Sequence, residues 1–212
     1  MRPIPQDRRA AATGFSLIEV LVAILIVVIG LLGLAGLQAR AQIAEFESYQ
    51  RAQALVLLYD MVERLNSNRI TARCFAITTA STGAPYFGDS TAAVTPTCGV
   101  DTAANNAMAV SAMSAWDGLL SGAAEKKGAS ATKVGAMIGA RGCISYDVNT
   151  EYVNATSGAN INDTGEYTIA VSWQGMADTF APTATCGKNL YGTEARRRTV
   201  WTTMRVGTLK AQ

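Results

Sequence analysis

One carboxylate lies inside an otherwise apolar run near the start of the chain. Residues 15–37 read FSLIEVLVAILIVVIGLLGLAGL, and Glu19 is the only charged residue among them. A carboxylate within a membrane-spanning helix costs about 2.5–3.5 kcal/mol on insertion scales, so a residue in this position should have a cationic partner. The alternative is an acid that reaches the polar surface of the membrane without a partner.

The other residue types limit the chemistry that the chain can perform. Its 212 residues include no histidine, which removes His-dependent triads, general bases and metal sites. We find no nucleophile elbow, Ser-x-x-Lys pattern, metal triad or phosphate-binding loop. The net charge is +2, and the charges of residues 1–14 account for it, so no basic surface indicates nucleic-acid binding. We therefore expect no enzymatic activity and no metal, cofactor or nucleic acid.

Four cysteines follow the apolar run: Cys74, Cys98, Cys143 and Cys186. An even number on the exported side of a membrane indicates two disulfides, for which three connectivities are possible. We favour the sequential pairing, Cys74 with Cys98 and Cys143 with Cys186. The first bond would hold a loop-rich connection, and the second would tie a strand to a long loop. The absence of a CxxC pair argues against a metal site.

The apolar run is long enough to cross a membrane. As a helix, residues 15–37 would extend about 34 Å, and a hydrocarbon core is about 30 Å thick. The preceding residues 1–14 are basic, so the positive-inside rule keeps them in the cytoplasm while the following chain is exported. A secretory signal peptide would have a shorter apolar run with small residues after it, whereas here the small residues 10–14 precede it. A plain signal anchor is the better alternative.

The start of this run carries a specific motif. Residues 14–19, GFSLIE, resemble the processing motif of type IV prepilins, G-F-[ST]-L-[IL]-E. The resemblance implies that a prepilin peptidase cuts between Gly14 and Phe15 and methylates the new N-terminus at Phe15. Glycine suits such a cut because it lets the backbone approach a protease closely. The resemblance also implies that Glu19 neutralises the N-terminal amine of a neighbouring subunit during assembly.

The helix should continue beyond the apolar run. Residues 38–69 form an amphipathic pattern without glycine or proline, so we predict one unbroken helix over residues 15–68. Its second half should pack under a soluble domain through an apolar stripe, made of Ile43, Phe46, Ala54, Leu57, Leu58, Met61, Val62 and Leu65. Gly30, Gly33 and Gly36 recur in the first half, and they indicate either close helix packing or a section that unwinds in a filament.

Residues 70–212 should form a globular head. Residues 70–100 and 121–140 are rich in turn-forming residues and predict loops. Between them we predict a helix capped by Asp101 and running to about Leu120. Strands are predicted over residues 143–148, 167–173 and 198–209. The resulting fold class is α+β and type IV pilin-like, with a long N-terminal helix packed on a small antiparallel sheet.

Three consecutive arginines, Arg196, Arg197 and Arg198, precede the last predicted strand. Such a triplet could contact DNA or another anionic surface. We favour a solvated edge at the start of a strand.

The C-terminal part of the head resembles one class of pilins. The segments GCISYD, YTIAVSWQG and RRRTVWTTMRV within residues 142–206 are similar to the C-terminal half of PilV-type minor pilins. The resemblance implies a minor pilin that helps to initiate assembly of type IV pili and is incorporated into them. Its partners would be the major pilin, other minor pilins, the prepilin peptidase and the inner-membrane assembly platform.

Two other functions stay open. The prepilin motif does not separate a minor pilin from a minor pseudopilin of a type II secretion system, which gene neighbourhood would distinguish. A signal-anchored periplasmic enzyme would need a catalytic constellation of the kinds excluded above. We expect a single-pass protein of the bacterial inner membrane, with a cytoplasmic N-terminus and a periplasmic head, that is also found in assembled pili.

Overall fold

The computed structural model describes residues 14–88, 94–128, 132–133, 135 and 137–207. The chain divides into two compact units, Met1–Ala44 and Glu45–Gln212. Helix α1, Leu17–Ser67, contributes residues to both units. The predicted long N-terminal helix is therefore confirmed.

In the first unit, the side chains of α1 face outward on all sides. Every described residue from Gly14 to Ala44 is exposed, although most of this stretch is apolar. The free energy of removing such an apolar surface from water is strongly favourable. Within the described chain, however, no layer covers it.

The second unit, Glu45–Gln212, combines the second part of α1 with the head, and it contains an antiparallel sheet with the strand order β3-β4-β5. Its strands are β3 (Arg141–Asp147), β4 (Glu166–Gln174) and β5 (Arg197–Arg205). Ile144 of β3 lies opposite Ile169 of β4, which in turn lies opposite Thr202 of β5. The small antiparallel sheet is as predicted, and together with α1 it gives the type IV pilin-like α+β fold. The last strand predicted over residues 198–209 is too long, since β5 ends at Arg205, and residues 208–209 lie outside the described chain.

The central strand β4 follows the predicted alternation. One face of this strand is buried in the main core of the head, through Tyr167, Ile169, Val171 and Trp173. Ala170 and Ser172 on the other face are also buried, and Ala170 packs with Cys143 and Cys186. The sheet is therefore covered on both faces around β4.

The second half of α1 packs on the core face of the sheet. Its buried apolar residues are Ala54, Leu57, Leu58, Met61 and Leu65. The predicted stripe is wrong at its start, where Ile43 is 41% and Phe46 is 43% exposed. The buried residues of α1 begin only at Gln50.

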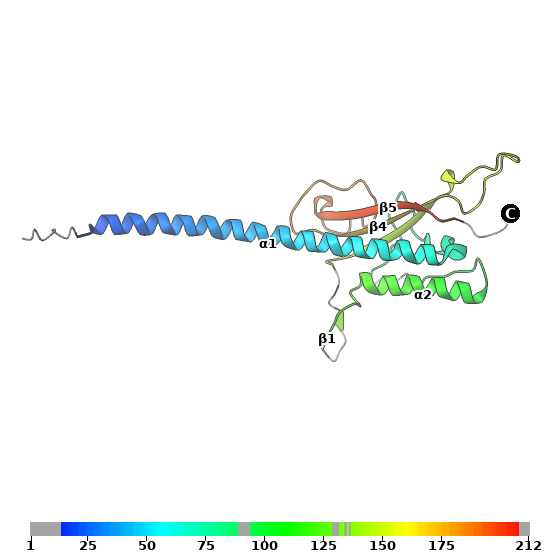
Figure 1. The fold of residues 1–212 in the computed structure, drawn as a ribbon, viewed down its shortest axis with the longest axis horizontal. Coiled ribbons are helices and arrows are strands. Elements are labelled where there is room, and N and C mark those ends of the chain that lie inside the picture. The colour runs from blue at the N-terminus through cyan, green and yellow to red at the C-terminus, as the bar shows by residue number, and fades with distance from the viewer. Residues whose placement is uncertain (1–13, 89–93, 129–131, 134, 136, 208–212) are drawn as a thin grey trace, which may run out of the picture. The chain divides into compact units, whose positions relative to one another are not determined.

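Helix α2, Ala103–Leu120, lies alongside the head portion of α1 (Figure 1). The predicted stripe of α2 is confirmed, since Ala109, Met113, Trp116 and Leu120 are all buried. Trp116 Nε1 donates a hydrogen bond of 2.9 Å to the Leu57 carbonyl of α1. Apolar packing and one buried polar contact thus join the two helices.

The predicted cap of α2 is wrong by one residue. The N-cap is Thr102, whose hydroxyl accepts a hydrogen bond from the Asn105 N–H at 3.3 Å. Asp101 accepts from the Asn105 side-chain amide instead. Both residue types are good caps, so the sequence alone did not distinguish them.

Short elements complete the described part of the head. They are the 3-10 helices η1 (Arg69–Phe75), η2 (Val148–Thr150) and η3 (Glu194–Arg196), and the antiparallel strands β1 (Lys126–Lys127) and β2 (Thr132–Lys133). The prediction of a loop throughout residues 121–140 is therefore wrong at β1 and β2. Strands this short carry no alternating apolar pattern that could be read beforehand.

Candidate processing and assembly site

The predicted cleavage junction lies just before α1. Gly14 and Phe15 precede the helix, and the Phe15 side chain is 85% exposed. The first helical hydrogen bonds run from the N–H groups of Glu19 and Val20 to the Ser16 carbonyl, at 3.1 and 3.3 Å. The peptide bond between Gly14 and Phe15 is thus outside the helical hydrogen-bond ladder, as a protease that binds extended backbone would require.

Gly14 has no packing role within the described chain. A Cβ atom added to Gly14 would meet no atom within 4 Å. If glycine is required at this position, the reason must be that another molecule approaches the backbone there.

Glu19 lies in the first turn of α1. A negative charge is favourable there because the N-terminal end of a helix carries a partial positive charge. The side chain is exposed among apolar neighbours, and none of the residues described in the structure forms an ion pair with it. The arrangement leaves Glu19 able to accept a cation from another molecule.

Gly30, Gly33 and Gly36 lie within continuous helix. An added Cβ at any of the three would meet no atom within 4 Å, so their small size serves no contact inside the described chain. Glycines on a helix let another helix approach closely in a membrane. Contacts within the described chain therefore do not decide between the two interpretations of these glycines, close packing and local unwinding.

The first half of α1 meets the length and composition expected of a membrane span. Its most apolar window has a mean hydropathy of 3.1, and none of that window is buried in the chain. This separates it from the core helix of a soluble protein, which would be mostly buried. The motif at residues 14–19 adds independent sequence information.

Comparison with known families gives one match. Residues 9–35 match the prokaryotic N-terminal methylation motif. The chain carries a type IV prepilin-like N-terminus. The matched residues include the Gly14–Phe15 junction and Glu19, and the apolar helix fits a membrane-anchored pilin. A search of curated proteins and a search of solved structures each found no match.

The cysteines of this prepilin-like chain form two disulfides. Cys74 is bonded to Cys98, and Cys143 of β3 is bonded to Cys186. The bonds close stretches of 24 and 43 residues, for which loop entropy gives about 3.5 and 4 kcal/mol of stabilisation. Among the residues described, no cluster of three or more His, Cys, Asp or Glu side chains could hold a metal.

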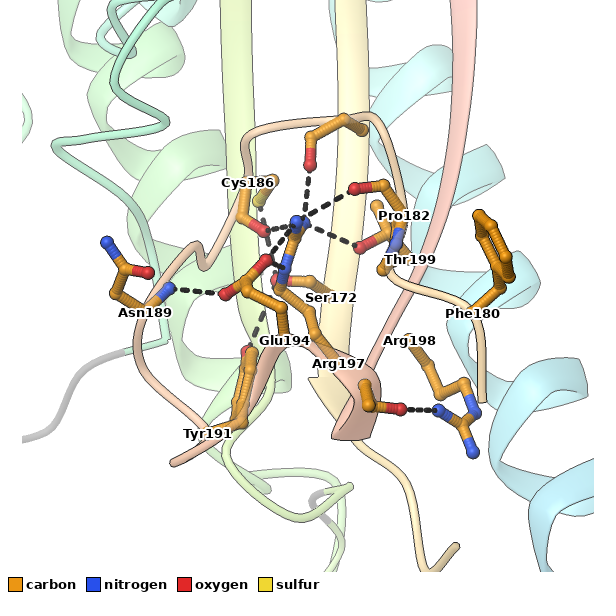
Figure 2. A network of polar contacts seen from close by, with 12 residues as sticks. Ser172, Phe180, Pro182, Cys186, Asn189, Tyr191, Glu194, Arg197, Arg198 and Thr199 are labelled. Carbon is orange, nitrogen blue, oxygen red and sulfur yellow. Dashed lines mark hydrogen bonds and ion pairs between the residues drawn. The ribbon is translucent and has the colours of Figure 1, made fainter. Parts of the chain in front are cut away.

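The interpretation of the arginine triplet as a solvated edge is wrong for Arg197 and Arg198, whereas Arg196 is half exposed. Arg197 is only 1% exposed, and its guanidinium contacts Glu194 Oε2 at 2.6 Å. It also donates to the backbone carbonyls of Pro182, Ala184 and Cys186 (Figure 2). This one side chain therefore fixes the segment that leads to the second disulfide.

The two neighbouring arginines have separate partners. Arg198 Nη2 lies 3.1 Å from Glu47 Oε1 of α1, and Arg196 Nε lies 3.0 Å from Asp178 Oδ1. The triplet therefore binds groups of its own chain on all three side chains, which argues against a free cationic patch. The sequence signal that could have suggested this was the acidic residue Glu194 three positions before Arg197.

Proposed function

We propose that the chain is a minor type IV pilin of the PilV class, which helps to initiate pilus assembly and is incorporated into the filament. The observation that carries the proposal is the methylation motif over residues 9–35, followed by an apolar helix that the chain leaves uncovered. Type IV pilin-like proteins are structural proteins, and the proposed role is accordingly structural.

Processing is the first step of the proposed function. Residues 1–14 are a leader that a prepilin peptidase removes by cutting between Gly14 and Phe15. The cut converts an amide nitrogen into an amine, which the same enzyme methylates. The exposure of both residues ahead of the helical ladder supports access of a peptidase to this bond.

Assembly depends on the amine that processing creates. We propose that Glu19 pairs with the Phe15 amine of a neighbouring subunit within the membrane or filament core. A carboxylate in apolar surroundings is costly when alone, and a cationic partner offsets much of that cost. An axial offset of about one helical turn between subunits would bring the two groups together, since Glu19 lies about one turn beyond Phe15.

The proposed topology follows from these steps. Residues 15–37 span the bacterial inner membrane, residues 38–69 continue the helix in the periplasm, and residues 70–212 form the periplasmic head with its two disulfides. The partners are the prepilin peptidase, the inner-membrane assembly platform, the major pilin and other minor pilins. The similarity of residues 142–206 to PilV-type pilins supports the assignment to a pilus.

Fractionation of cells tests this function. A tagged full-length chain should be recovered in pili sheared from the cell surface as well as in the membrane. Recovery should vanish from the sheared fraction when the major pilin is deleted. A chain found only in membranes, in cells whose sheared pili are otherwise complete, would contradict the proposal. Dependence on a type II secretion system instead would assign the chain to the pseudopilins.

A further inference from the structure

The head presents one phenylalanine almost entirely to solvent. The Phe180 side chain is 97% exposed, the highest value for a large apolar residue in the described chain. By contrast, Phe75 and Phe87 of the same head are fully buried. Phe180 belongs to the segment between β4 and the second disulfide, residues 175–185, which we term the Phe180 loop.

The start of this loop is held by Glu47 of α1. Glu47 Oε1 accepts hydrogen bonds from the N–H groups of Met176 and Ala177, at 3.0 and 3.1 Å. Arg198 Nη2 reinforces the contact, because it lies 3.1 Å from the same carboxylate oxygen and 2.6 Å from the Ala177 carbonyl. Two charged side chains therefore fix the backbone that precedes Phe180.

The residues next to Phe180 are held as well. The Thr179 N–H donates to the Ala195 carbonyl at 2.8 Å, and Asp178 is paired with Arg196. Beyond the ring, the Pro182 carbonyl accepts from Arg197 Nη2 at 3.0 Å. Figure 2 shows the Phe180 ring on the side of its loop that points away from the Arg197 network.

Scattered apolar residues on a protein surface are ordinary. Phe180 differs because full exposure is combined with a backbone fixed on both sides. A side chain presented in this way loses little conformational entropy on binding, which favours affinity. Aromatic side chains that become buried when a partner binds contribute a large share of the binding energy at protein interfaces.

We propose that Phe180 is an anchor residue that inserts into an uncharged, apolar hollow on the head of a neighbouring pilin-type subunit. The chemistry of the loop favours a protein over a membrane surface. Its sequence, GMADTFAPTAT, has one charged residue, Asp178, and no lysine or arginine that could attract anionic lipid headgroups. The exposed neighbours Met176 and Ala181 extend the apolar contact. This inference rests on the proposed function as a filament subunit.

Site-specific photocrosslinking in the native host tests the contact. The full-length chain would carry p-benzoylphenylalanine at position 180 or, as a control, at Tyr152, an aromatic residue that is 59% exposed in another loop. We expect position 180 to yield an adduct with a protein that carries a prepilin-type N-terminus, in about tenfold or greater excess over position 152. A lipid adduct, an adduct with a protein of another class, or equal yields at the two positions would overturn the proposal.

A substitution provides the second readout. Phe180→Ala should lower recovery in sheared pili about tenfold or more, whereas Phe180→Trp should retain most of it. Because the side chain touches almost nothing in its own head, Phe180→Ala should keep the wild-type unfolding midpoint and N-terminal processing. If the wild-type chain is in pili and Phe180→Ala is recovered equally, the anchor proposal fails alone. If the wild-type chain is absent from pili, the proposed function itself fails.

Discussion

The charged residues of the two units differ in where their partners come from. Arg197 in the head is buried, and its own chain supplies a carboxylate and several carbonyl acceptors. Glu19 in the first unit lies among exposed apolar residues and has no ion-pair partner in the described chain. The comparison shows that Arg197 is satisfied by groups of its own described chain, whereas Glu19 is not.

The apolar residues show the same difference. In the head, the large apolar residues of α2 and β4 are mostly buried in one core. In the first unit, every described residue is exposed. Substitutions in the first unit should therefore affect processing and assembly, and substitutions in the head core should affect unfolding.

The largest expected effect comes from Gly14→Val. A Cβ at this position meets no atom of the described residues within 4 Å, so folding should be unchanged, but a peptidase that contacts the backbone would be blocked. We expect almost no mature protein on immunoblots and almost none in sheared pili. Gly30→Ala is the matched control, because it has equally open surroundings and should be processed normally. Normal maturation of Gly14→Val would remove the role assigned to this glycine.

Glu19→Val separates processing from assembly. The substitution leaves the cleavage junction intact, so maturation should proceed, but a neighbouring amine would lose its partner in apolar surroundings. Leaving one charge of a buried pair unpaired costs about 3–5 kcal/mol, and recovery in pili should fall by at least about tenfold. Glu45→Val, which removes the same charge from an exposed position later in α1, should assemble normally. Equal recovery of both variants would contradict the pairing.

Arg197→Met tests the other side of the comparison. The substitution removes the guanidinium that donates to Glu194 and to several carbonyls. The free energy of unfolding should therefore fall by about 3–5 kcal/mol. The neighbouring Arg196 is half exposed, and Arg196→Met should change this free energy by only about 0.5 kcal/mol. Denaturant titration of the full-length chains in detergent, followed by tryptophan fluorescence, measures both. Similar losses in the two variants would show that burial of Arg197 is not what stabilises the loop.

The smallest expected effect is a pH dependence of the head. Burial raises the pKa of Glu194, but the Asn189 N–H and the Arg197 guanidinium outweigh it and hold this pKa below its ordinary value of 4.5. A pKa lowered by folding stabilises the protein above the unfolded value, and that contribution is lost as the pH falls through the folded value. Unfolding free energies should therefore decline below about pH 4.5, and less steeply in Glu194→Gln than in the wild type. Equal slopes would exclude Glu194 as a source of the acid sensitivity.

Periodic patterns made much of the fold predictable. The long helix, the buried stripe of α2 and the alternation of β4 each depend on side chains repeating with the period of one element. The motif that contains Gly14, Phe15 and Glu19 could be recognised from the sequence because it is contiguous and does not depend on tertiary folding. The roles assigned to these three residues stay predictions.

The features that sequence reasoning missed depend on contacts between distant residues. Arg197 looks like a surface charge until the segment of residues 182–186 folds over it and supplies carbonyls. Phe46 looks like a core residue because its spacing fits, but the head does not bury α1 there. Glu194 three positions before Arg197 hints at their ion pair, but no local pattern determines the burial of Arg197 or the exposure of Phe46, since each depends on where a loop or a layer ends.

The N-terminus of the chain in assembled pili tests the central claim most directly. Intact-mass and peptide mass spectrometry of protein from sheared pili should show a chain that begins at an N-methylated Phe15 and lacks residues 1–14. A chain in the same pili that still begins at Met1 would contradict the account.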